Sequence, residues 1–162
     1  MAQTALNMVD QGTELSCVVI PAGKRRLLLP NVCVAEIVPW RRIKEVRDTP
    51  DWCLGITGWR GITIPVLDYA AFTGEAATAT PRCLVVMNRA RSREGQPFYA
   101  MAAEALPYMV QLSDEDLRGD NSNLGEADVM AVKMGAETAF IPDLEYIETQ
   151  VRMLTGGSKT PE

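Results

Sequence analysis

Short apolar segments separated by turn-forming residues make up most of the chain. They are rich in β-branched residues and are bounded by Gly, Pro, Asn or Asp, a pattern typical of strands. We predict strands at residues 15–20, 26–29, 62–67, 83–87, 98–101, 129–132 and 139–141. Gly23 and Gly135 lie between neighbouring segments, where they predict hairpin turns.

Helical patterns are few and short. Residues 31–37 and 69–72 predict single turns, and residues 143 to about 154 predict a C-terminal helix that Asp143 can cap. The predicted helix has an apolar face formed by Ile147, Val151 and Leu154. The whole pattern therefore predicts an all-β fold with a short C-terminal helix.

The two ends of the chain differ from its middle. Residues 1–13 lack periodicity, and residues 155–162 are polar and rich in Gly, so we expect flexible tails on either side of a domain over residues 14–154. A length of 162 residues suits one domain or two small packed units. Hydrophobic residues make up 47% of the chain, which is enough for a core.

The charge of the chain is negative and uneven. Its net value is −5, with +3 in residues 1–95 and −8 in residues 96–162. A negative protein does not attract phosphate, so general nucleic-acid binding is disfavoured. The unequal halves could orient partners along a row of subunits, or they could simply be solvated surface.

Composition also removes most catalytic chemistry. Histidine is absent, so the usual proton shuttle and the commonest metal ligand are missing. The four cysteines form no CxxC pair, and the glycines form neither a dinucleotide fingerprint nor a P-loop, so we expect reduced thiols, no metal and no cofactor. No apolar run reaches about 18 residues and no leader pattern opens the chain, which predicts a cytoplasmic protein without membrane insertion. We therefore expect a binding protein and not an enzyme.

Residues 34–68 carry the most informative motif. Val34-Ala35-Glu36-Ile37 is followed by Pro50, by Gly55-Ile56-Thr57-Gly58-Trp59-Arg60-Gly61 and by Ile64-Pro65-Val66-Leu67-Asp68. This layout resembles the CheW-like domain. A weaker likeness at residues 99–104, with Glu104 in place of an aspartate, extends the resemblance to about residues 14–150. Residues 27–36 resemble most closely the ChpC-type adaptors of systems that control type IV pili and twitching motility.

The resemblance implies both a fold and a function. The fold would be two small five-stranded SH3-like barrels packed around a shared core. The function would be that of an adaptor at membrane-associated chemosensory arrays. It would couple the cytoplasmic tip of a methyl-accepting chemoreceptor to the CheW-like regulatory domain of a CheA-type histidine kinase. The partner-binding residues that the resemblance implies are Arg60, Glu36, Val34, Ile37, Gly55 and Gly61.

Two residues depart from the family pattern. Gly58 replaces an asparagine, and Trp59 replaces an aliphatic residue. Gly58 and Gly61 can both adopt positive φ, so we expect the tight turn to survive. The asparagine that would pin the loop is missing, and we expect receptor affinity to change.

The residues alone leave several alternatives open. Arg60 could pair with a carboxylate of a partner, or it could clamp the two subdomains from within. Glu36 could set specificity at the rim of a patch, or it could be an ordinary solvated carboxylate. Trp40, Trp52 and Trp59, with basic residues among them, could bind a peptide or single-stranded nucleic acid on an SH3-like barrel, or they could belong to core and rim.

Overall fold

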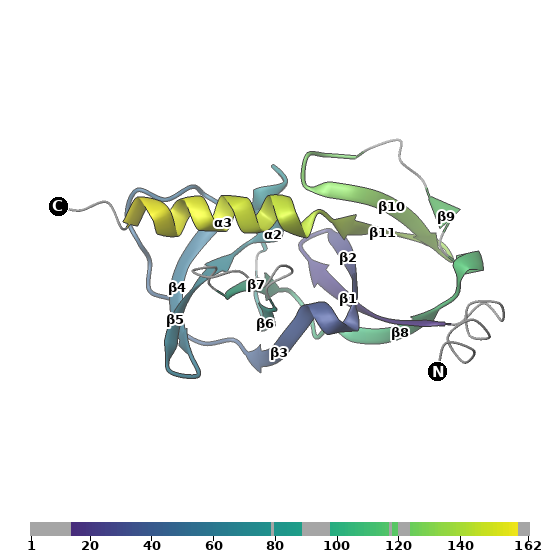
Figure 1. Cartoon of the computed structure of the whole chain (residues 1–162), viewed down its shortest axis with the longest axis horizontal. Helices are drawn as coiled ribbons and strands as arrows, with labels where there is room; N and C mark the ends of the chain where they lie inside the picture. The colour runs from purple at the N-terminus through teal and green to yellow at the C-terminus, as the bar shows by residue number, and fades with distance from the viewer. Residues whose placement is uncertain (1–13, 79, 89–97, 117, 120–123, 159–162) are drawn as a thin grey trace, which may run out of the picture.

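Two curved β-sheets form the body of the protein, and one C-terminal helix starts beside the first sheet and lies across the second (Figure 1). The computed structural model describes residues 14–78, 80–88, 98–116, 118–119 and 124–158. The tail predicted at residues 1–13, and residues 159–162 of the tail predicted at 155–162, lie outside this range. None of the described helices is long and apolar enough to cross a membrane.

The first sheet combines the beginning and the end of the chain. Its strand order is β8-β1-β2-β11-β10-β9, with β2 and β11 parallel and the other neighbours antiparallel. The strands are β1 (Leu15–Ala22), β2 (Arg25–Pro30), β8 (Tyr108–Leu112), β9 (Arg118–Gly119), β10 (Asp128–Met134) and β11 (Glu137–Pro142). Because the chain leaves this sheet after β2 and returns at β8, the two halves of the molecule are interleaved.

The second sheet comes from the middle of the chain. Its strand order is β3-β6-β7-β5-β4, so β3 and β4 are its two edges. The strands are β3 (Val34–Pro39), β4 (Cys53–Trp59), β5 (Ile62–Leu67), β6 (Cys83–Met87) and β7 (Tyr99–Ala103). The helical elements are η1 (Asn31–Cys33), α2 (Tyr69–Phe72), η2 (Asp114–Asp116) and α3 (Leu144–Ser158).

Alternating strand residues divide the core into three parts. In β1, Cys17 and Val19 face the core inside the first sheet, whereas Val18 and Ile20 face the core between the sheets. The third part lies inside the second sheet. Helix α3 also contributes to the central part, through Ile147 and Val151, which lie about one turn apart on the same face. The other members of this part include Leu67, Tyr69, Val85 and Met101.

The mostly β, two-sheet fold with a C-terminal helix is confirmed, with the two-residue β9 as a sixth strand of the first sheet. Both predicted hairpin turns are present, with φ of 66° at Gly23 and 65° at Gly135. The helix predicted over residues 31–37 is wrong after Cys33, because Val34 and its successors pair with β6. Asp143 caps α3 by accepting a hydrogen bond from the amide of Tyr146, and this helix continues past residue 154, the expected end of the domain.

A buried ion pair and its neighbours tie the first sheet to the segment between β5 and β6 of the second. We call Arg25, Asp128, Glu75 and Tyr69 the Arg25 cluster. Arg25 donates to both carboxylate oxygens of Asp128, at 3.1 and 3.0 Å, and to Glu75 at 2.9 Å. The Tyr69 hydroxyl donates to Asp128 over 3.2 Å. The guanidinium also lies 4.0 Å from the centre of the Phe140 ring. Four side chains from distant parts of the sequence are thereby held in one place.

Candidate partner-binding surface

The two edges of the second sheet are joined by side chains. Glu36 lies on β3 and Trp59 on β4, and the indole Nε1 donates to Glu36 Oε1 over 2.9 Å. Arg60 Nη2 lies 3.1 Å from the same oxygen. One carboxylate oxygen thus accepts the indole N–H and forms the ion pair with Arg60. We call these three residues the Glu36 cluster.

The turn after Trp59 sets the direction of Arg60. Trp59 pairs with Ile62, so the hairpin has a two-residue loop of Arg60 and Gly61, with φ of 49° and 80°. Two successive positive φ values are typical of a type I′ turn, which matches the twist of the flanking strands. A non-glycine residue in this region costs about 1–2 kcal/mol, so the surrounding contacts hold Arg60 there. The expected tight turn is present and uses the positive φ of Gly61, whereas Gly58 lies within β4 and pairs with Thr63.

The loop is held without the family asparagine. Arg41 Nη1 donates to the carbonyl oxygen of Gly58 over 2.9 Å. The Trp59 ring packs against Phe98 at 5.1 Å between ring centres, and the Arg60 guanidinium lies 5.0 Å from the Trp59 ring centre. Trp59, which departs from the family pattern, thus packs against Phe98, lies beside Arg60 and donates its hydrogen bond to Glu36. Neither this pairing nor the Arg41 contact could be read from spacing.

Exposure separates the members of the Glu36 cluster. The Trp59 residue is 8% exposed, the Glu36 side chain 39% and the Arg60 side chain 68%. Among the described residues, the polar side-chain contact of Arg60 is to Glu36 of the same sheet, so Arg60 does not clamp the two sheets together. Its exposed ion pair leaves guanidinium donors facing solvent, where a partner can reach them.

The remaining predicted residues have different surroundings. Val34 is half-buried against the core between the sheets, whereas Ile37 is 39% exposed. An irregularity between Val34 and Glu36 changes the register of β3 and lets the two side chains face different neighbours. Gly61 has open space around it. Val34 is therefore part of the support of this surface, and Ile37 is part of its exposed area.

Gly55 acts beneath the surface. It is buried, and a Cβ atom at this position would overlap the carbonyl oxygen of Lys44. The Lys44 and Ile56 backbones exchange two hydrogen bonds of 2.9 Å at this crossing. Gly55 also has a φ of 136°, which side chains disfavour. This residue allows the segment after β3 to cross β4, and it offers no area to a partner.

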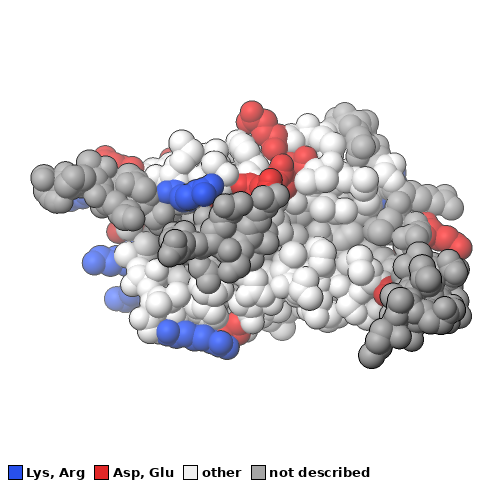
Figure 2. All heavy atoms as spheres, in the orientation of Figure 1, with Lys and Arg blue, Asp and Glu red and all other residues white. Residues whose placement is uncertain are grey.

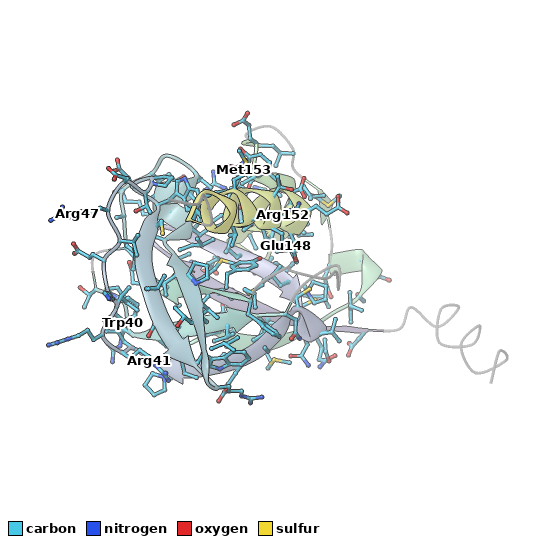
Figure 3. All side chains as sticks on the ribbon, turned by 60° about the vertical axis from the view of Figure 1, so that its left-hand side comes forward. Trp40, Arg41, Arg47, Glu148, Arg152 and Met153 are labelled. Carbon is cyan, nitrogen blue, oxygen red and sulfur yellow. The ribbon has the colours of Figure 1, made fainter. Side chains whose placement is uncertain are left out.

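The three tryptophans do not form one aromatic surface. Trp59 lies in the core of the second sheet, and Trp52 packs edge-on against Phe72 at 4.9 Å. Trp40 is 36% exposed and lies along the outer side of the second sheet with Arg41 and Arg47 (Figure 3). The core-and-rim interpretation of the tryptophans therefore fits the geometry better than a binding strip.

The described side chains offer little for catalysis. Among them, no group of three His, Cys, Asp or Glu residues could hold a metal ion. Burial raises the pKa of the thiols of Cys17, Cys33 and Cys83, and the charge of Glu148 adds to this at Cys33. A raised thiol pKa reduces the thiolate fraction and with it nucleophilicity.

Comparison with known proteins gives matches over most of the chain. A model of the CheW-like domain family matches residues 16–151. Chemotaxis protein CheW from Rhizobium meliloti (strain 1021) is 24% identical over 119 residues, which is 73% of this chain and 73% of that protein. The crystal structure of scaffolding protein TtCheW from Thermoanaerobacter tengcongensis aligns with a TM-score of 0.67 at 17% identity, covering 80% of this chain and 89% of that chain. This structural likeness shows a shared fold.

Proposed function

The chain belongs to the CheW-like domain family, and we propose that it is a chemotaxis adaptor that couples chemoreceptors to a CheA-type histidine kinase. The names of the matched proteins, one a chemotaxis protein and one a scaffolding protein, support this proposal. So does the composition of the described surface, which offers an exposed, oriented arginine and no catalytic group. Binding is then the whole activity of this protein.

The observation that carries the proposal is the geometry of Arg60. The type I′ turn fixes its backbone, and Glu36 and the Trp59 ring restrain its side chain without burying it. A restrained guanidinium loses less conformational entropy when it binds a carboxylate or a backbone carbonyl. Exposed Ile37 and Ile62 supply apolar area on the same two edges of the sheet. We assign this surface to the cytoplasmic tip of a methyl-accepting receptor.

The rest of the assembly follows from the same proposal. The kinase contributes its CheW-like regulatory domain, and the adaptor holds receptor and kinase at a fixed distance, so that receptor movement reaches the kinase. The adaptor works in the cytoplasm, at membrane-associated arrays. The likeness of residues 27–36 to ChpC-type adaptors supports a system that controls type IV pili and twitching motility.

Calorimetric titration tests the proposal. The full chain is titrated with a receptor cytoplasmic hairpin and, separately, with the kinase regulatory domain; we expect binding to each. Arg60→Ala should weaken the receptor complex about tenfold or more. Arg26→Ala is the matched control, because Arg26 also forms an exposed ion pair, with Glu137 at 3.2 Å, but lies on the first sheet. If the folded protein binds neither partner, the proposal is wrong.

A further inference from the structure

The first sheet has an open edge at β8. In a hairpin with a two-residue turn, the flanking pair, here Ala22 and Arg25, is hydrogen-bonded, and such pairs then alternate along the ladder. Alternation directs the backbone groups of Val18 toward β2 and those of Cys17 toward β8. Cys17 faces Val110 of β8. Val110 is therefore bonded to β1, and its neighbours in β8 point the other way.

Those neighbours are Met109 and Gln111. Their N–H and C=O groups face away from β1, and in the described part of the chain no backbone group accepts from or donates to them. The residues are also exposed, Met109 to 52%. A row of free donors and acceptors on an exposed edge is the template on which an additional strand forms.

A groove of about 890 Å³ lies beside this edge. It runs between β8 with η2 on one side and the turn of the β10–β11 hairpin on the other. Val110, Leu112 and Met134 give it an apolar floor that is continuous with the core inside the first sheet. An added strand on β8 would place every second side chain over this floor.

The rim of the groove is acidic. Its charged lining residues are Glu115, Asp116 and Glu137 against a single cation, Lys133. Hydrogen bonds from the amide and then the hydroxyl of Ser113 lower the pKa of Asp116, which keeps this carboxylate ionised. Most of the Lys and Arg side chains visible in Figure 2 lie instead toward the end of the molecule that carries β4 and β5 in Figure 1.

We propose that β8 accepts an extended, basic segment of a partner protein as an additional strand. Its alternate apolar side chains fill the groove, and its Lys or Arg side chains face Glu115, Asp116 and Glu137. A second copy of this chain fits less well, because its basic segment around Lys44 already pairs its backbone with Ile56. The site lies on the other sheet from Arg60, so it is a second surface, apart from the one assigned to the receptor.

Fluorescence anisotropy with labelled eight-residue peptides tests this. The probe alternates Lys and Val, one control alternates Glu and Val, and another has four Lys followed by four Val. We expect binding of the alternating basic peptide only, accompanied by slower amide hydrogen exchange at Met109 and Gln111. Equal binding of the block peptide, or of the acidic peptide, would overturn the proposal.

Two pairs of variants locate the site. Met109→Pro removes an outward N–H without removing a bond to β1, and we expect about tenfold weaker binding, whereas Met109→Ala should bind almost normally. Glu115→Lys should also weaken binding, and Glu45→Lys, an equal charge change on the segment between β3 and β4, should not. A thermal melt checks that the Met109→Pro variant is folded. If it is not folded, the comparison of Glu115→Lys with Glu45→Lys tests the site. Loss of peptide binding with self-association of the wild type would instead assign this edge to a second copy.

Discussion

Two arginine clusters in this protein have the same parts and opposite surroundings. Arg25 and Arg60 each face a carboxylate, at 3.0 and 3.1 Å, and each lies over an aromatic ring, at 4.0 and 5.0 Å. The side chains of the first pair, Arg25 and Asp128, are 12% and 0% exposed. Those of the second, Arg60 and Glu36, are 68% and 39% exposed. Burial, and not contact chemistry, distinguishes them.

That difference separates a structural role for Arg25 from the binding role that we propose for Arg60. Burial opposes the charge of Arg25, but hydrogen bonds and charge from Glu75 and Asp128 outweigh it and raise its pKa. The Arg25 and Asp128 side chains are both buried, so removal of either one leaves the other as an unpaired buried charge. Arg60 keeps water on most of its surface, so its ion pair contributes little to stability and its donors are available.

The largest effect should come from Asp128→Ala. The substitution leaves the Arg25 guanidinium, the Tyr69 hydroxyl and the Gly125 amide without their shared acceptor. We expect the free energy of unfolding to fall by about 3–5 kcal/mol, measured by urea denaturation. Glu137→Ala, which removes an exposed carboxylate from the same sheet, should cost less than about 1 kcal/mol. Equal losses would remove the distinction between the clusters.

Trp59→Leu should have the next largest effect. It restores the aliphatic residue of the family pattern but removes the bond to Glu36 and the packing on Phe98. We expect a loss of about 2 kcal/mol in stability. Weaker receptor binding should accompany it, because Arg60 loses the ring beneath it. Unchanged receptor affinity in this variant would show that Arg60 needs no support from Trp59.

Alkaline pH should act on the Arg25 cluster through Tyr69. Burial, and then the charge of Asp128, raise the pKa of this phenol above its ordinary 10.0. The folded state therefore binds the proton more tightly, and the contribution is present below pH 10 and is lost as pH rises. Between pH 10 and 11 the loss should be about 1 kcal/mol for this residue. Tyr69→Phe should flatten that part of the profile in urea titrations, and an unaltered profile would contradict the assignment.

Arg60→Ala should have the smallest effect on stability and the clearest on binding. We expect a change in unfolding free energy below about 1 kcal/mol, since the ion pair is exposed and the substituted residue lies in a turn. A loss as large as that of Asp128→Ala in the same urea assay would make Arg60 a structural residue and leave the receptor surface without its central contact.

The sequence predicts the strands whose apolar runs are continuous, and it misses those whose pattern is interrupted. Cys53–Trp59 contains two glycines, one required where Lys44 crosses it, so its β-forming character is diluted. Tyr108–Leu112 is an edge strand in which Tyr108, Met109 and Gln111 are exposed, and two residues, Val110 and Leu112, on its inner face are too few to reveal it. Edges and crossings depend on tertiary neighbours, which no local window contains.

The candidate site divides in the same way. The motif around Arg60 is visible because a turn and its neighbours are contiguous. Arg25 gives no such signal, since it lies between Lys24 and Arg26 and nothing local says which of the three is buried. Its partner Asp128 is 103 residues away. The missing asparagine at Gly58 was expected to leave the loop less restrained, and the bond from Trp59 to Glu36 cannot be read from the sequence because it joins β3 to β4.

The interleaved sheets have a consequence for synthesis on the ribosome. Strand β2 pairs with β11, and 106 residues separate Pro30 from Glu137. At about 5–20 residues per second, β2 waits roughly 5 to 20 seconds for its neighbour to be made. Throughout that interval the backbone of β2 has β1 as its one ladder partner, and its edge toward β11 stays open. The nascent chain therefore keeps an open strand edge, exposed to mispairing and to chaperones, until β11 emerges, and a truncated product that lacks β11 cannot complete the first sheet.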